Sequence, residues 1–364
     1  MKCLSFPRSL GFLLLVLLAT VTALATPSPS RRRTSIVTGA NGYIGREIVH
    51  VLLRDNNGDE SEQDIFCLVR QARVESETNY WKNKGNADCV TVLPYDMLDG
   101  GETIRHALTV ATDDDDDNVN NQQELCVYHI ASVFGPSEDH VQTANDNVQG
   151  TKDLVSVVSE FPSCRLVVTS SMAAVRGSGQ EPLNGKYYTH QDWNTKSKLG
   201  DNWGASYQWS KAESERQAWD ESKKLGVPMT SICPSFVFGP PSDGMMTSSY
   251  SITLVGQWVR GESEVQSRLC VDIRDVARAH VAAGTMDQAV GERIIVSKEE
   301  RIPSKDMAEA LKDVCRTTGL GNPDAITYDS KFEGGPMAIG DKEVDAADRL
   351  KNLLGIELRP VQDT

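Results

Sequence analysis

The chain has 364 residues, of which 39% are hydrophobic and 24% are charged, and its formal net charge is −14. This length suits one large domain or two modest ones, and the composition is that of a globular protein. The acidic balance provides no basic surface for nucleic acid, so nucleic-acid binding is excluded as the main function class.

The first 25 residues have the pattern of a secretory signal peptide. Lys2 and Arg8 flank the start, residues 10–18 are almost wholly apolar, and Ala23-Leu24-Ala25 matches a small-x-small cleavage site. The apolar stretch is short for a membrane span. We therefore expect entry into the secretory pathway (endoplasmic reticulum or secretion) and no stable membrane insertion after cleavage, with an uncleaved signal anchor as the alternative.

Residues 26–34 are basic and rich in Ser and Pro. They form either a linker or a second targeting element, in which case the two-part signal resembles those for plastid import.

The segment Thr38-Gly-Ala-Asn-Gly-Tyr-Ile-Gly45 follows a short apolar run and precedes residues 46–54, whose apolar positions recur at helical spacing. Its glycines therefore lie in a strand-to-helix turn. Without a Cβ the backbone can approach a pyrophosphate closely, and the amides that open the helix can bind phosphate. An ordinary glycine-rich turn is the alternative. The candidate cofactor-binding residues here are Gly39, Asn41, Gly42, Tyr43, Ile44 and Gly45.

A second strand is predicted at residues 65–69, and Arg70 follows it. An acidic residue at this position would bind the ribose 2′-hydroxyl of NAD. Arg70, with Arg73, instead suits a 2′-phosphate, so NADP(H) is favoured over NAD(H). A surface arginine without a ligand is the alternative.

Asp96 and Met97 follow a third predicted strand, residues 89–93. The carboxylate would accept a hydrogen bond from the adenine amino group, and a turn or helix-cap aspartate is an equal alternative. Residues 102–111 are predicted to be helical. The unbroken Asp run 113–117 indicates a solvated loop, and no metal site is expected.

The fourth predicted strand, residues 125–131, ends in small residues that let a cofactor lie close, which makes Ala131 and Ser132 cofactor-binding candidates. His129 lies within this strand and is predicted to be a packed core residue rather than a catalyst. A helix follows, in which Asn147 would tie the helix to the neighbouring strands. A fifth strand, residues 165–169, ends at Ser170 and Ser171, and parallel strands carry chemistry at their carboxyl ends.

Tyr207 and Lys211 are four residues apart in a predicted helix, so they share one face. A free tyrosine has a pKa of about 10, and a neighbouring ammonium favours the phenolate and lowers that pKa. The lysine can also hold the nicotinamide ribose, and Ser171 can bind the substrate oxygen. The three would move a proton to or from that oxygen while hydride moves at the adjacent carbon. A chance pair on a surface helix is the alternative.

The remaining elements are a sixth strand at residues 227–236, a loop near the substrate at 242–256, a strand at 271–273, a helix at 274–286, a strand at 293–296, and helices at 304–315 and 341–354. We predict an α/β fold with a doubly wound parallel sheet, the NAD(P)-binding Rossmann fold. Residues 35–238 would form the nucleotide-binding domain, with 270–296 returning to it. Residues 239–364 would form a smaller C-terminal substrate lobe.

Across residues 35–296 the chain resembles the extended short-chain dehydrogenases/reductases of the NAD-dependent epimerase/dehydratase superfamily, and most closely their dihydroflavonol 4-reductase and cinnamoyl-CoA reductase group. The matching segments are Thr38-Gly-Ala-Asn-Gly-Tyr-Ile-Gly45, Val69-Arg70, His129-Ile-Ala131, Asn147-Val-Gln-Gly-Thr151, Val168-Thr-Ser-Ser171, Tyr207-x-x-x-Lys211, Cys233-Pro-Ser-Phe-Val-Phe-Gly-Pro240 and Val271-Asp-Ile-Arg-Asp-Val-Ala-Arg-Ala-His280.

This resemblance implies that Ser171, Tyr207 and Lys211 form a catalytic triad. It also implies that Arg70 binds NADP and that Pro234 and its neighbours, Val237 included, line the nicotinamide pocket. Ser170 stays an alternative for the serine, and Ser171 is favoured because the family pattern places it second.

The leading hypothesis is therefore an NADP-dependent oxidoreductase that interconverts a carbonyl and an alcohol on a small organic substrate, and a homodimer is compatible with it. Two alternatives stay open. One is a sugar-nucleotide epimerase or dehydratase with retained NAD, and the other is a non-catalytic NADP-binding sensor.

Overall fold

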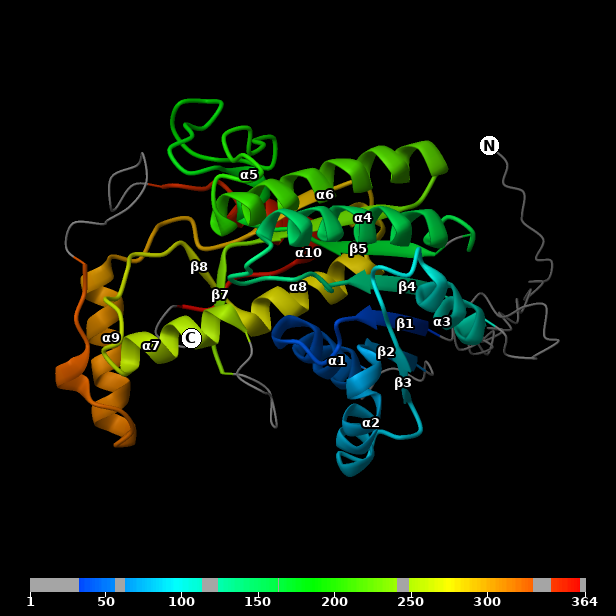
Figure 1. The fold of residues 1–364 in the computed structure, drawn as a ribbon, viewed down its shortest axis with the longest axis horizontal. Helices are drawn as coiled ribbons and strands as arrows, with labels where there is room; N and C mark the ends of the chain where they lie inside the picture. Colours follow the sequence, from blue (N-terminus) through cyan, green and yellow to red (C-terminus); the bar gives the residue numbers. More distant parts are fainter. Residues whose placement is uncertain are drawn as a thin grey trace, which may run out of the picture.

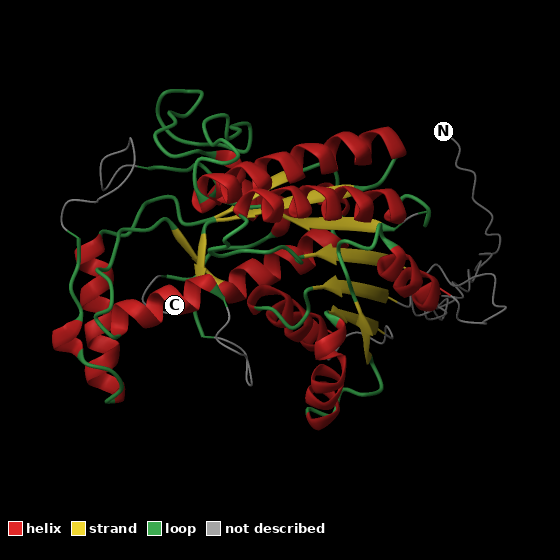
Figure 2. Ribbon diagram, in the orientation of Figure 1, coloured by secondary structure: helices red, strands yellow, loops and turns green. Residues whose placement is uncertain are grey.

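The computed structural model describes residues 33–55, 63–112, 124–162, 164–240, 249–329 and 342–360. At its centre lies a seven-stranded sheet with the order β3-β2-β1-β4-β5-β6-β9 (Figures 1 and 2), in which all paired neighbours are parallel. The predicted doubly wound sheet is confirmed. The strands are β1 Arg33–Thr38, β2 Gln63–Val69, β3 Val90–Pro94, β4 Glu124–His129, β5 Arg165–Thr169, β6 Met229–Pro234 and β9 Arg293–Val296.

Helices cover both faces of this sheet (Figure 2). The α-helices are α1 Tyr43–Asp55, α2 Val74–Asn83, α3 Glu102–Thr112, α4 His140–Val158, α5 Met172–Val175, α6 Trp203–Leu225, α7 Tyr250–Val259, α8 Ile273–Thr285, α9 Ser304–Thr318 and α10 Ala347–Leu354. Short 3-10 turns occur at Gln71–Arg73, Asp287–Ala289 and Pro323–Ala325.

An apolar core lies between the central sheet and the helices on each of its two faces. Two neighbouring residues of β1 illustrate this arrangement. Val37 packs with residues of α1, α8 and α10 on one face, whereas its neighbour Ile36 packs with residues of α3, α4 and α6 on the other. Successive residues of a strand point to opposite faces. Strands covered on both sides are therefore apolar nearly throughout, as the sequence of this sheet is.

A smaller lobe lies beside the carboxyl ends of the central strands. It contains the two-stranded parallel sheet of β7 Phe236–Phe238 and β8 Cys270–Asp272. Trp258 of α7 and Met307 of α9 belong to a separate apolar cluster there. Figure 1 shows β7 and β8 between the central strands and the α7–α9 pair.

Several elements differ from the sequence-based expectations. Residues 250–259 of the predicted loop 242–256 form α7, and the predicted sixth strand divides at Ser235 into β6 and β7. The helix predicted from residue 341 starts at Ala347, because Val344 is buried and bridges Tyr188 in an extended conformation. α10 packs on the central core rather than in the C-terminal lobe. The helices α2 and α5 were not predicted.

The predicted signal peptide and the Asp run 113–117 lie outside the described residues. So does most of the predicted linker, although its last two residues, Arg33 and Thr34, belong to β1. Among the residues that the structure describes, we find no helix with the length and apolar character needed to cross a bilayer.

Candidate active site

In the turn between β1 and α1, neighbouring backbone atoms lie so close to two of the glycines that neither position can accommodate a side chain. Gly39 has a φ of 66°, and a Cβ there would lie 3.2 Å from the backbone of Ala131 at the end of β4. A Cβ on Gly45 would lie 2.2 Å from the Gly39 carbonyl oxygen. The first-turn amides of α1 lack partners within the helix. These amides lie at the carboxyl end of β1, and the strand order of the sheet reverses between β1 and β4. The turn is therefore suited to bind a pyrophosphate.

The side chains of Tyr43 and Ile44 hold the turn in place. The Tyr43 hydroxyl donates to the Gly239 carbonyl at 2.8 Å, and burial raises the pKa of this phenol. Ile44 packs against the core under α1. Asn41 and Gly42 are half-buried in the turn itself. The residues of this turn would therefore meet a phosphate with their backbone.

Arg70 and Arg73 lie on one tight turn after β2, where the Arg73 amide donates to the Arg70 carbonyl at 2.7 Å. Both arginines are exposed. Asp96, at the end of β3, is exposed and closes a turn by accepting from the Leu98 amide at 2.9 Å. Met97 packs against Gly150 of α4. Asp96 thus takes part in a turn, and its adenine-binding role stays a prediction.

Thr38, the last residue of β1, fixes the end of β4 next to the glycine turn. Its hydroxyl oxygen accepts from the amides of Ile130 and Ala131, each at 3.1 Å, and it bonds to the His129 ring at 3.0 Å. Burial lowers the pKa of His129 to about 3, so this imidazole is a neutral core residue, as predicted. The Asn147 side chain bonds to both backbone polar groups of Val133, so it ties α4 to the segment that follows β4 rather than to a strand itself.

Tyr207 lies near the start of α6, which Asn202 caps by accepting from the Ala205 amide at 3.0 Å. Its hydroxyl interacts with the side chain of Ser171, the N-cap of α5, and this interaction favours a lower pKa of the phenol. Ser170 points elsewhere and donates to the Glu215 carboxylate at 2.7 Å. Of the two serines at the end of β5, Ser171 is therefore the one that meets Tyr207.

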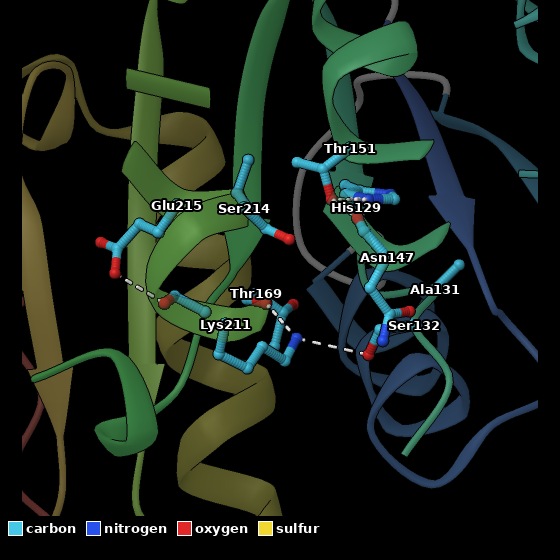
Figure 3. Close-up of a pocket in the computed structure, with 11 residues that line it drawn as sticks. His129, Ala131, Ser132, Asn147, Thr151, Thr169, Lys211, Ser214 and Glu215 are labelled. Atoms are coloured by element: carbon cyan, nitrogen blue, oxygen red, sulfur yellow. Dashed lines mark hydrogen bonds between the residues drawn. The ribbon is translucent and has the colours of Figure 1, made fainter. Parts of the chain in front are cut away.

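Lys211 links the ends of β4 and β5 (Figure 3). Its ammonium donates to the Ser132 hydroxyl at 3.3 Å and to the Thr169 carbonyl at 3.1 Å. Burial lowers the pKa of Lys211 to about 8, although the Glu215 charge opposes the change.

The expected lowering of the Tyr207 pKa is not found. Burial raises it to about 12, and the hydrogen bond to Ser171 only partly offsets that rise. Removal from water disfavours the phenolate more than its polar neighbours favour it.

Comparison with known proteins agrees with this geometry. A family profile described as male sterility protein, an NAD-binding family, matches residues 37–271. The chain belongs to this family of extended short-chain dehydrogenases/reductases. An oxidoreductase of Schizosaccharomyces pombe, described as uncharacterized, is 31% identical over an alignment of 315 residues, and the match covers 82% of this chain and 87% of that protein.

Two further similarities point the same way. Cinnamoyl-CoA reductase 1 of Arabidopsis thaliana is 27% identical over an alignment of 270 residues, and the match covers 72% of this chain and 70% of that protein. The crystal structure of yeast methylglyoxal/isovaleraldehyde reductase Gre2 with NADPH has a TM-score of 0.73 and 23% identity, over 91% of this chain and 95% of that one. The chain is thus an oxidoreductase of the extended type, as its motifs indicated.

In this extended dehydrogenase/reductase, Glu215 continues the helix face of Tyr207 and Lys211 at the same four-residue spacing. Its buried carboxylate accepts from Arg293 of β9 at 2.7 and 3.0 Å and from Ser231 of β6 at 2.6 Å. The Arg293 guanidinium also lies 3.8 Å from the centre of the Trp193 ring. Sequence reasoning missed this network, although the third position of the i, i+4, i+8 series was a visible signal.

Aromatic rings surround Tyr207 on its other side. The Phe134 ring lies 4.3 Å from that of Tyr207, centre to centre. Tyr250 of α7 lies 5.1 Å from Phe134 and 5.4 Å from Trp203. The predicted nicotinamide-pocket residues Pro234 and Val237 are buried at the end of β6 and in β7.

The lowered pKa of Lys211 makes stability depend on pH. Between about pH 8 and its ordinary pKa of 10.5 the unfolded chain binds more protons at this site, so unfolding becomes harder as the pH rises. We expect the free energy of unfolding of wild type relative to Lys211→Met to rise by roughly 1–2 kcal/mol from pH 8 to 9.5. Urea unfolding at both pH values measures it, and a constant or falling difference would contradict this burial effect.

Proposed function

We propose that this chain is an NADPH-dependent reductase that converts a carbonyl on a small organic substrate to an alcohol. The observation that carries the proposal is the interaction of the Tyr207 hydroxyl with the Ser171 side chain, with Lys211 one helical turn further, at the carboxyl ends of the parallel strands. The similar yeast protein is a methylglyoxal/isovaleraldehyde reductase complexed with NADPH, which supports both the carbonyl substrate and the cofactor.

Each residue of the site has one task in this proposal. Tyr207 donates a proton to the carbonyl oxygen, and Ser171 donates a hydrogen bond to the same oxygen. Lys211 holds the ribose hydroxyls of the cofactor. When bound, the nicotinamide supplies the hydride. A phenol whose pKa burial raises to about 12 is protonated at neutral pH, as a proton donor for reduction must be.

The phosphates of the cofactor would rest on the glycine turn, and the 2′-phosphate on the turn that carries Arg70 and Arg73. We expect wild type to use NADPH in preference to NADH. Because a hydrogen bond to a charged group contributes about 1.5–3 kcal/mol, Arg70→Ser should lower kcat/KM for NADPH roughly tenfold to a hundredfold and leave that for NADH unchanged. Lys82→Ser on α2, also at an exposed site, is the control, and an equal loss with both cofactors would refute the assignment.

The test of the function is oxidation of NADPH, followed at 340 nm, with a panel of aldehydes and ketones. Turnover that depends on the carbonyl compound supports the proposal. NAD that stays bound through purification, with no turnover of any carbonyl, would favour the sugar-nucleotide alternative. NADPH binding without turnover would favour the sensor.

A further inference from the structure

Three arginines form a row in which neighbouring guanidinium groups share single acceptor oxygens. Arg176 Nη2 lies 3.3 Å from Glu343 Oε1, and Arg301 Nη2 lies 3.1 Å from the same oxygen. Arg301 Nη1 and Arg268 Nη1 both donate to the Ser267 carbonyl, at 3.1 and 3.2 Å. The order of the row is therefore Arg176, Arg301, Arg268, and we call it the arginine row.

The positive charge of the arginine row exceeds the negative charge of the described carboxylates that pair with it. Among the described residues, Glu343 is the one carboxylate that forms ion pairs with the row, so two of its three positive charges have no carboxylate partner there. Arg268 bonds to the neutral Gln266 side chain at 2.6 Å and lies over the rings of Phe236 and Trp258. Burial lowers the pKa of Arg268, and the charges of Arg301 and Arg176 lower it further.

Holding like charges together in a half-buried place costs free energy unless a counter-charge joins them. Guanidinium groups are well suited to supply paired hydrogen bonds to a carboxylate or a phosphate. The Arg176 side chain keeps 25% of its surface exposed, whereas Arg301 keeps 8%, so the row is accessible from its Arg176 end.

Contacts join the row to the reacting end of the molecule. α5 alone separates Arg176 from Ser171, and the Arg176 amide donates to the Met172 carbonyl at 3.0 Å. At the other end, Arg268 lies over the ring of Phe236 in β7, which is next in the chain to Val237 of the predicted nicotinamide pocket.

We propose that the arginine row binds an anionic group, a carboxylate or a phosphate, on the substrate whose carbonyl Tyr207 protonates. This inference rests on the proposed function and names the substrate class: an aldehyde or ketone that carries an oxyanion at a distance from the reacting carbon. The row would then hold the far end of the substrate while Ser171 and Tyr207 hold the carbonyl.

The test compares aldehydes that differ only in charge: 4-formylbenzoate, its methyl ester, and 4-formylphenyl phosphate. We expect kcat/KM of wild type for at least one anion to exceed that for the ester by tenfold or more, and the better anion identifies the group. Arg268→Gln should reduce this ratio at least tenfold. Arg260→Gln, in the same lobe and paired with Glu262 on the surface, should leave the ratio unchanged.

Equal kcat/KM values for the ester and both anions in wild type would overturn the inference while leaving the reductase activity standing, whatever the variants do. If no aldehyde is reduced, the proposed function fails, and the row is tested separately by calorimetric titration of wild type with benzoate, inorganic phosphate and benzamide. Binding of either anion at least tenfold tighter than benzamide supports the row as an anion site, and no such difference overturns it.

Discussion

Replacing Tyr207 by phenylalanine is expected to lower kcat for carbonyl reduction roughly a hundredfold to ten-thousandfold, the range that a positioned proton donor contributes. The change deletes one oxygen, which in the wild type interacts with Ser171. The ring stays, so its contact with Phe134 is retained. Affinity for NADPH should therefore change little.

The measurement is NADPH oxidation under saturating cofactor, with NADPH affinity followed by fluorescence. Tyr187→Phe, a half-buried tyrosine outside the site, provides the matched control and should keep the wild-type rate. Equal rates in wild type and Tyr207→Phe would remove Tyr207 from the mechanism. A loss confined to KM would assign it to substrate binding alone.

Replacing Arg293 by methionine is expected to lower the free energy of unfolding by about 3–5 kcal/mol, because the Glu215 carboxylate stays buried without its counter-ion. The side chains of Arg293 and Glu215 are only 7% and 1% exposed. Urea unfolding measures the loss. The substitution should also disturb the active site, because the Glu215 carboxylate accepts a hydrogen bond from Ser170, the neighbour of Ser171.

A second arginine–glutamate pair supplies the control. Arg105 and Glu160 form the same two-bond arrangement at 2.8 and 2.7 Å, but their side chains are 43% and 45% exposed. Arg105→Met should cost about 0–1 kcal/mol. Adding Glu215→Gln to Arg293→Met should recover part of the loss, because the uncompensated charge is removed. Similar losses for the two single variants would contradict this account of burial.

The parts of the fold that the sequence predicted depend on local patterns. The run before Gly39 and the helical spacing after Gly45 predicted β1, its turn and α1, since both are set by neighbours in the chain. The division of β6 from β7 was not predictable in this way. Ser235 lies within a stretch that has the composition of a single strand, and only the pairing of Phe236–Phe238 with β8 separates β7 from the central sheet.

The residues of the candidate active site fall into the same two groups: those predictable from local sequence patterns and those that depend on contacts distant in the chain. Ser171, Tyr207 and Lys211 belong to segments whose elements were predicted, and the structure brings them together. The partner of Glu215 could not be predicted, because Arg293 lies 78 residues further along the chain. The direction of the Tyr207 pKa change was wrong for a related reason: neighbouring charges can be seen in a sequence, whereas removal from water cannot.

The position of Arg293 in the chain has a consequence for synthesis on the ribosome. Glu215 emerges with α6, but its counter-ion belongs to the last strand of the sheet and emerges 78 residues later. Until then a nascent chain gains little by closing α6 over β5 and β6, because closure would bury the Glu215 carboxylate without its guanidinium partner. The active site of this enzyme is therefore completed late in translation, and a chain that terminates before Arg293 lacks the counter-ion of Glu215.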